Sequence, residues 1–193
     1  MSEKRFVNID PGHGGSDPGA VAAGVEEEDI TLASAVSLGH ELRLLDIGTA
    51  LTRSDDTFIA VMDRADHVDP GELFVSLHVN SCGDAKPNGV SVWYHGAHVP
   101  SKRLAEHIFN AIYSLHWLGR YGAGVISDTT RYANGFGVLR EATQRGAAGA
   151  VLIELGFIPN EKDRMVISDQ RKRNLIAKAI AAAIQDFFKE IGK

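Results

Sequence analysis

Hydrophobic and polar positions along this chain follow two periods, one typical of buried strands and one typical of amphipathic helices. Short apolar runs that end in turns indicate strands, and apolar residues three or four positions apart indicate helices. We therefore expect strands at residues 5–9, 48–52, 72–78, 89–95 and 148–155. We expect helices at residues 30–45, 57–67, 101–118 and 175–188, and an irregular surface connection over residues 119–137.

The alternation of strands and helices predicts the fold class. Strand–helix–strand units join parallel strands, so we expect a single three-layer α/β domain with a mostly parallel mixed sheet flanked by helices. No internal repeat, low-complexity segment or linker divides residues 1–193, which favours one domain. Acidic residues 26–29 precede the first long helix, where negative charge suits the helix dipole.

Composition argues against several classes of protein. The formal net charge is -5 and no Lys/Arg-rich block is present, so we expect no binding to nucleic acid. The short basic cluster at 170–173 is interpreted as the solvated first turn of a helix. No stretch approaches the ~20 apolar residues that span a bilayer, so we expect no membrane insertion. The single cysteine, Cys82, lies in a polar segment and is expected to be a free surface thiol.

The beginning of the chain has no apolar segment of the kind that forms a secretory signal. Residues 1–5 are mostly polar and lead directly into the first expected strand. We therefore expect synthesis in the cytoplasm without a signal peptide.

Three residues with metal-binding or catalytic chemistry stand at the ends of expected strands. His13 follows the first strand in a Gly-rich turn, His78 ends the strand at 72–78, and Glu154 lies near the end of the most apolar strand. The carboxyl ends of parallel strands meet at one edge of a sheet. Two imidazoles and a carboxylate form the His₂Glu set of hydrolytic zinc sites, and a second carboxylate can serve as the base. One of Glu26, Glu27 and Glu28 could supply the additional acid.

Each of these residues also has a structural interpretation. A histidine at a strand end is often simply hydrogen-bonded there, and an acidic triplet often only begins a helix. Glu154 is harder to explain structurally, because a carboxylate inside an apolar strand loses hydration. The remaining histidines have no partner acid in register and are interpreted as structural or solvated: His40, His67, His95, His98, His107 and His116.

Ordered sequence blocks along nearly the whole chain carry a resemblance to a known family. They are IDPGHGG at 9–15 with DPGA at 17–20, EEDITLA at 27–33, LTR at 51–53, SLHVNS at 76–81, VLR at 138–140 and VLIELGFIPN at 151–160. This pattern resembles the catalytic domain of the zinc-dependent N-acetylmuramoyl-L-alanine amidases of the amidase-3 group. The chain has Glu28 where the family usually has Lys, and FVSLH at 74–78 where it usually has FISIH.

The resemblance implies a function and a set of site residues. It implies a phosphorylase/hydrolase-like fold and one Zn²⁺ per chain, held by His13, Glu27 and His78, with Glu154 as the catalytic acid/base. The choice of Glu27 rests on the family register, and the residues alone leave Glu26 and Glu28 open. Asn80, Arg140 and Asp10 are expected near the substrate or behind the ligands. The implied reaction cleaves the amide between N-acetylmuramic acid and the L-alanine of the stem peptide.

The biological setting is a further expectation. We expect peptidoglycan as the partner, a monomer, no attached wall-binding module, and an endolysin-type lytic role, with an excised domain of an exported amidase as the competing interpretation. No second amphipathic helix is expected within 119–137, which favours an open site. Two alternatives of function remain, a zinc exopeptidase of related architecture and a non-catalytic peptidoglycan-binding module.

Overall fold

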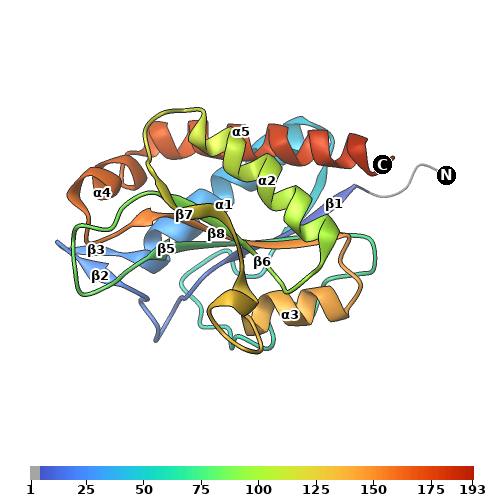
Figure 1. Ribbon diagram of the computed structural model, residues 1–193, viewed down its shortest axis with the longest axis horizontal. Helices are drawn as coiled ribbons and strands as arrows, with labels where there is room; N and C mark the ends of the chain where they lie inside the picture. The colour runs from blue at the N-terminus through green and yellow to red at the C-terminus, as the bar shows by residue number, and fades with distance from the viewer. Residues whose placement is uncertain (1–4) are drawn as a thin grey trace.

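A six-stranded sheet forms the centre of the computed structural model, which describes residues 5–193 (Figure 1). Its strands lie in the order β4-β1-β5-β8-β6-β7, and every neighbouring pair is parallel except β6 and β8. The strands are β1 (Phe6–Pro11), β4 (Gly48–Leu51), β5 (Leu73–Asn80), β6 (Val90–Tyr94), β7 (Arg120–Ser127) and β8 (Gly149–Phe157). The expected mostly parallel mixed sheet is therefore confirmed.

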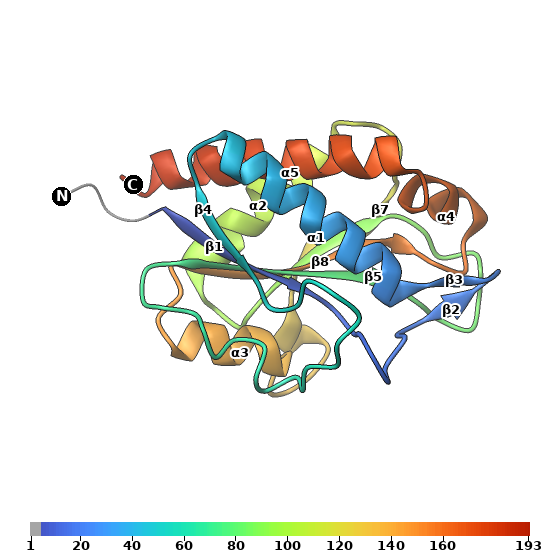
Figure 2. The same ribbon diagram turned by 180° about the vertical axis from the view of Figure 1, so that it is seen from behind.

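Helices cover both faces of this sheet. Figures 1 and 2 show α1 (Glu27–Leu44), α2 (Val99–Tyr113) and α5 (Gln170–Glu190) on one face and α3 (Gly137–Gln144) on the other. The short helix α4 (Glu161–Ile167) lies at the end of the sheet where β2 (Val21–Ala22) and β3 (Val25–Glu26) form a hairpin. The expected three layers are present.

The alternation of side chains along each strand divides the core into two parts. In β5 and β8, Val75 and Ile153 join the large cluster beneath α1, α2 and α5. Phe74 and Leu152 point the other way and join a smaller cluster with Leu139 of α3. Since His78 and Glu154 keep the parity of Phe74 and Leu152, the pleat places both on the α3 side of the sheet.

Residues 57–67 do not form the expected helix. The segment is a series of turns, in which Asp63 N donates to Ala60 O and Asp66 N donates to Asp63 O. Its larger apolar side chains Phe58, Val61 and Met62 are more than half exposed, and only the small Ala65 is fully buried among its apolar side chains. Without burial of an apolar face, a short helix has too little packing to offset its nucleation cost, and the prediction was wrong.

The expected surface connection over 119–137 was also wrong in its first half. Residues 120–127 form the edge strand β7, which pairs in parallel with β6. Gly122 and Gly124 adopt positive φ angles there, and the pairing with β6 shifts register between Val90 and Val92. These irregularities interrupt the alternation that marks a strand in a sequence.

Other differences concern short elements and helix ends. The sequence pattern did not predict the β2–β3 hairpin, α3 or α4, all of which are eight residues or shorter. Helix α2 ends at Tyr113, five residues before the expected end, and His116 adopts a φ of 60° in the following turn. Cys82 is exposed and free, as expected. None of the helices in residues 5–193 has both the length and the hydropathy to cross a bilayer.

Candidate metal centre

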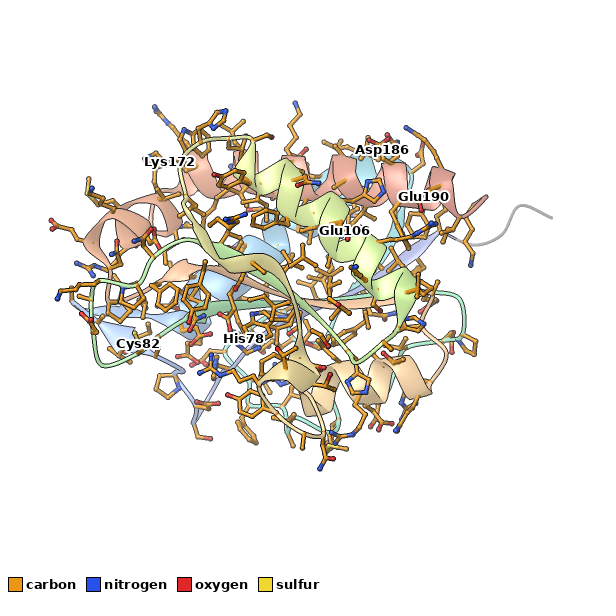
Figure 3. The ribbon with its side chains drawn as sticks, in the orientation of Figure 1. His78, Cys82, Glu106, Lys172, Asp186 and Glu190 are labelled. Atoms are coloured by element: carbon orange, nitrogen blue, oxygen red, sulfur yellow. The ribbon has the colours of Figure 1, made fainter. Side chains whose placement is uncertain are left out.

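The carboxyl ends of β1, β5 and β8 bring the candidate residues to one edge of the sheet. Pro11 pairs with Leu77, and His78 pairs with Glu154. Beyond β1 the chain turns at Gly12 and His13, and the His13 backbone adopts a φ of 63°. Figure 3 shows His78 at the sheet, with Cys82 in the loop beyond β5 and Glu190 on the opposite helical layer. The parallel register therefore determines which side chains meet.

Glu27 lies between the two histidines. Its Oε1 atom is 3.2 Å from Nε2 of His13 and 3.1 Å from Nδ1 of His78. One ligand atom from each of the three residues lies within 4.8 Å of the others, and they form the one such group among the described residues. This set of two imidazoles and a carboxylate matches the ligands of catalytic zinc sites.

Backbone groups fix the Glu27 carboxylate from behind. Val79 N donates to Oε1 at 2.8 Å, and Ala20 N donates to Oε2 at 3.0 Å. Burial alone would raise the pKa of Glu27, but hydrogen bonds from His13 and His78 outweigh that effect and hold its pKa below the usual range. Glu27 is therefore an ionised, preoriented acceptor at the first residue of α1.

The other two acids of the triplet point elsewhere. Glu28 lies against Asp56, and burial together with the Asp56 charge raises the pKa of the Glu28 carboxyl. Glu26 occupies the N-cap position of α1 and is half-buried. Of the three acids, Glu27 is the one that the fold brings to His13 and His78.

Asp17 orients the His13 ring. Its Oδ2 atom lies 2.8 Å from Nδ1 of His13, and its Oδ1 atom accepts a hydrogen bond from Gly19 N. Burial disfavours the charged imidazole, but Glu27 and Asp17 outweigh it and raise the pKa of His13 to about 9. A proton on Nδ1 satisfies Asp17 and leaves Nε2 facing Glu27, which is the arrangement that carboxylate partners impose on metal-binding histidines.

Glu154 faces a cavity that His13 and His78 also line. The cavity has a volume of about 260 Å³, and its walls include the apolar side chains Phe58, Val61 and Phe136. The Oε2 atom of Glu154 is buried and has no hydrogen-bond partner among the described residues. Burial, with a contribution from the charge of Glu27, raises the pKa of Glu154 to about 7. Such a carboxyl can accept and return a proton near neutral pH.

The other three expected residues are distributed around this edge. Asp10 is fully buried and accepts hydrogen bonds from Thr52, Ser76 and Arg64. Arg140 donates from Nη1 to Asn134 O, so it supports the loop before α3. Asn80 ends β5, and its carbonyl accepts a hydrogen bond from Ile158 N.

Several residues of the site carry no signal in the sequence pattern. Arg64 donates to Asp10 Oδ1 and to the carbonyls of Pro11 and His13 from a segment 51 or more positions away. Asp17 differs from Arg64, because a carboxylate four residues after a histidine in a turn is a signal from which its contact with His13 could have been predicted. The expectation that the remaining histidines lack acidic partners was wrong for His95, which contacts Asp128, and for His107, which contacts Glu190.

Comparisons with known proteins place this fold and site in a family. The family model described as N-acetylmuramoyl-L-alanine amidase, Amidase_3, matches residues 7–186. The "Probable cell wall amidase LytH" of Staphylococcus aureus is 30% identical over 188 residues, which are 95% of this chain and 58% of that protein. The chain thus spans less than two thirds of the length of this curated relative.

Solved structures agree with the family match. An N-acetylmuramoyl-L-alanine amidase from Clostridium difficile 630 has a TM-score of 0.86 and 29% identity, covering 99% of this chain and 100% of that chain. The catalytic domain of CwlV from Bacillus (Paenibacillus) polymyxa has a TM-score of 0.81 and 30% identity, covering 96% and 98%. With the ordered motifs and the His–Glu–His group at the sheet edge, these matches establish that the chain belongs to the Amidase_3 family of N-acetylmuramoyl-L-alanine amidases.

Proposed function

We propose that this protein is a zinc-dependent peptidoglycan amidase that cleaves the amide between N-acetylmuramic acid and the L-alanine of the stem peptide. The observation that carries the proposal is the group of His13, Glu27 and His78 at a cavity that His13, His78 and Glu154 line, in an Amidase_3 fold. A zinc exopeptidase and a non-catalytic wall-binding module remain the alternatives that an experiment must exclude.

The residues present fit a zinc ion. They supply two imidazole nitrogens and a carboxylate oxygen, and their atoms already lie within 4.8 Å of one another. The backbone makes room for this group, because a Cβ at Gly19 would lie 2.7 Å from the His13 ring and 2.8 Å from Glu27 Oε2. We propose His13, Glu27 and His78 as the ligands of one zinc ion per chain. A bound zinc ion supplies a Lewis acid that polarises an amide carbonyl and acidifies a water molecule.

Glu154 is proposed to move the protons of the reaction. With a pKa of about 7, its carboxylate can take a proton from the attacking water at Oε2, an atom that has no competing hydrogen bond. The same carboxyl then donates that proton to the departing nitrogen, so that L-alanine leaves with a free amine. Water adds to the carbonyl carbon, the C–N bond breaks, and the lactyl carboxylate remains on the sugar.

The cavity walls are proposed to exclude water and position the substrate. Phe58 and Val61 from the segment after β4 form one part of the wall, and Phe136 and Val138 at the start of α3 form another. Arg140 fixes the second part through Asn134 O, and we propose for it a positioning role. Asn80, at the end of β5 beside Glu154's strand, is proposed to contact the substrate.

Digestion of purified sacculi tests this function directly. An amidase releases intact stem peptides with a free L-alanine amine and leaves glycan strands without peptides, both of which mass spectrometry identifies. An exopeptidase would release single amino acids, and a binding module would release nothing. Chelation should abolish release and zinc should restore it. His78→Ala should remove activity together with stoichiometric zinc, whereas His116→Ala, in the turn after α2, should change neither.

The endolysin-type setting, the monomeric state and the open site stay predictions. The described residues 119–136 contain β7 and a single 3₁₀ turn, Asp128–Thr130, and no α-helix that would cover the cavity. An open site should give full activity for the purified protein alone. Strong stimulation by an added partner protein would contradict it.

A further inference from the structure

Arg53 is a buried residue that the reaction itself does not use. It follows β4, exposes 4% of its surface, and directs every guanidinium nitrogen at neutral oxygens. The acceptors, with distances, are Pro11 O (3.2 Å), Asp55 O (2.9 Å), Gly12 O (3.0 Å), Glu28 O (2.9 Å) and Thr31 Oγ1 (3.2 Å). One side chain thus contacts three separate parts of the chain: the Pro11–Gly12 turn, the loop at Asp55 and the first turn of α1.

Two of these acceptors belong to the segments that carry His13 and Glu27. The Gly12 carbonyl is part of the peptide that joins Gly12 to His13, and the Glu28 carbonyl is one residue beyond Glu27 on the first turn of α1. Both accept from the same nitrogen, Nη2, at 3.0 and 2.9 Å. Thr31 Oγ1 completes the link, since it also lies 2.8 Å from Gly12 O and 3.0 Å from Glu28 O.

A residue that only filled this space would be apolar. Burial, first of all, and the neighbouring charge of Arg64 lower the pKa of Arg53, and the opposing charges of Glu28, Asp10 and Asp56 do not reverse that shift. Within residues 5–193 no carboxylate oxygen lies within ion-pair distance of this guanidinium. A buried guanidinium without a direct ion pair is retained at a cost in stability, and its planar fork of N–H donors is what reaches all these oxygens.

The strained turn at His13 needs such a constraint. His13 adopts a φ of 63°, which a residue with a Cβ holds only when its surroundings fix it. Arg64 donates to the His13 carbonyl itself at 2.9 Å, while Arg53 holds the two preceding carbonyls. Arg53, which follows β4, therefore links the segment that carries His13 to the segment that carries Glu27. The third proposed ligand, His78, lies in β5 itself.

We propose that Arg53 is a positioning residue that sets the separation of His13 from Glu27 and thereby the metal affinity of the site. The inference rests on the proposed function, because it takes those residues as zinc ligands. It does not require activity to be measured, since it concerns the geometry of the site. Residues behind metal ligands typically contribute 10- to 100-fold to affinity.

Competition with a chromophoric chelator tests the proposal through zinc affinity. Arg53→Lys keeps the charge but loses the fork, and its zinc dissociation constant should rise about 10-fold or more. Thr31→Val keeps the shape of the side chain and removes the hydroxyl that contacts Gly12 O and Arg53. Its zinc dissociation constant should rise by less than that of Arg53→Lys. Cobalt-substituted Arg53→Lys should also show a visible spectrum that differs in intensity and band position from that of the wild type. A role in folding alone would lower the melting temperature of the metal-free protein and leave that spectrum unchanged.

Arg173→Lys is the matched control. Arg173 is half-buried and, like Arg53, donates to a backbone carbonyl, that of Ile167, but it lies on α5. Its zinc affinity and cobalt spectrum should equal those of the wild type. If Arg53→Lys and Thr31→Val both bind zinc within twofold of the wild type with unchanged cobalt spectra, the proposal is wrong. A wild type that binds zinc but fails to release stem peptides would instead overturn the proposed function.

Discussion

Single residues in this site act through the atoms that surround them. His13 combines a strained backbone with a ring oriented by Asp17, and Glu27 is held by two backbone N–H groups. Such preorganisation would keep the atoms of the proposed ligands close together before a metal binds, so that little free energy is lost in ordering them. The consequence is that small changes behind the ligands should have measurable effects on metal binding.

Replacing Glu154 by Gln separates proton transfer from metal binding. Glu154→Gln keeps the size of the side chain but cannot accept a proton, so kcat for stem-peptide release should fall by about 10² to 10⁴. Zinc affinity should stay within about twofold, because we do not assign Glu154 as a ligand. Glu190→Gln, on the opposite helical layer (Figure 3), should retain full activity. Near wild-type release by Glu154→Gln with zinc bound would contradict the mechanism.

Gly12 is expected to be essential for the position of His78. A Cβ at this position would lie 2.3 Å from Cε1 and 2.5 Å from Nε2 of the His78 ring, a distance that real contacts do not reach. Gly12→Ala should therefore displace the ring and weaken zinc binding at least 10-fold by chelator competition. Gly83→Ala is the control, because its Cβ would meet nothing within 4 Å. Equal zinc affinities for the two variants would show that the His78 ring can move without loss of zinc binding.

Among the elements, β8 and α4 are joined by a buried carboxylate. Asp163 of α4 accepts hydrogen bonds from Gly89 N at 2.6 Å and from Phe157 N at 2.9 Å. These bonds attach the beginning of β6 and the end of β8 to α4, at the edge of the sheet where the site lies. Burial nevertheless raises the pKa of Asp163 above its ordinary value of 3.8, despite the opposing effect of both bonds.

This raised pKa predicts a pH dependence of stability. The folded state binds the Asp163 proton more tightly than the unfolded state, so the free energy of unfolding falls as pH rises from about 3.8 through the raised value. Asp163→Asn removes this effect, and its stability relative to the wild type should increase over that pH window. Urea unfolding at a series of pH values measures the difference.

Asp169 supplies a control of opposite sign. Its pKa is lowered, first of all by the hydrogen bond from Lys172 N at the start of α5. The wild type should therefore gain stability relative to Asp169→Asn as pH rises through the lowered and ordinary values. If the stability difference between wild type and variant changed in the same direction with pH for Asp163→Asn and for Asp169→Asn, the explanation given for Asp163 would be wrong.

For the whole molecule, α5 joins the helical layer to the rest of the core. Phe187 is fully buried in the larger cluster, on the far side of the sheet from His78. Phe187→Ala should lower the free energy of unfolding by ~3–5 kcal/mol, because it removes buried apolar surface and leaves a cavity. Leu175→Ala, at an exposed position on the same helix, should change it by less than about 0.5 kcal/mol. Denaturant titration of both variants measures this contrast.

Zinc affinity should distinguish this global effect from the local ones. As long as Phe187→Ala remains folded, its zinc affinity should match that of the wild type, because Phe187 lies in the larger core cluster on the far side of the sheet from His78. A parallel loss of zinc affinity would show that the helical layer and the site are coupled.

The sequence by itself determined the layer architecture and the strands that carry the site. Buried strands and the amphipathic helices α1, α2 and α5 produce periodic patterns, since each must bury one face, and parallel strand ends meet at one edge. His13, His78 and Glu154 could therefore be selected before the fold was known. The residues alone left Glu26, Glu27 and Glu28 open, and only the resemblance favoured Glu27.

Only the tertiary structure decided which atoms meet. Glu27 reaches both histidines because β2, β3 and the first turn of α1 place it there, and Arg53 and Arg64 reach the His13 turn across long sequence separations. The turns at 57–67 and the edge strand β7 depend on long-range packing and on irregular pairing, which leave no period in the sequence. Contacts of this kind form between residues that are far apart in the sequence, so the local pattern of hydrophobic and polar residues does not predict them.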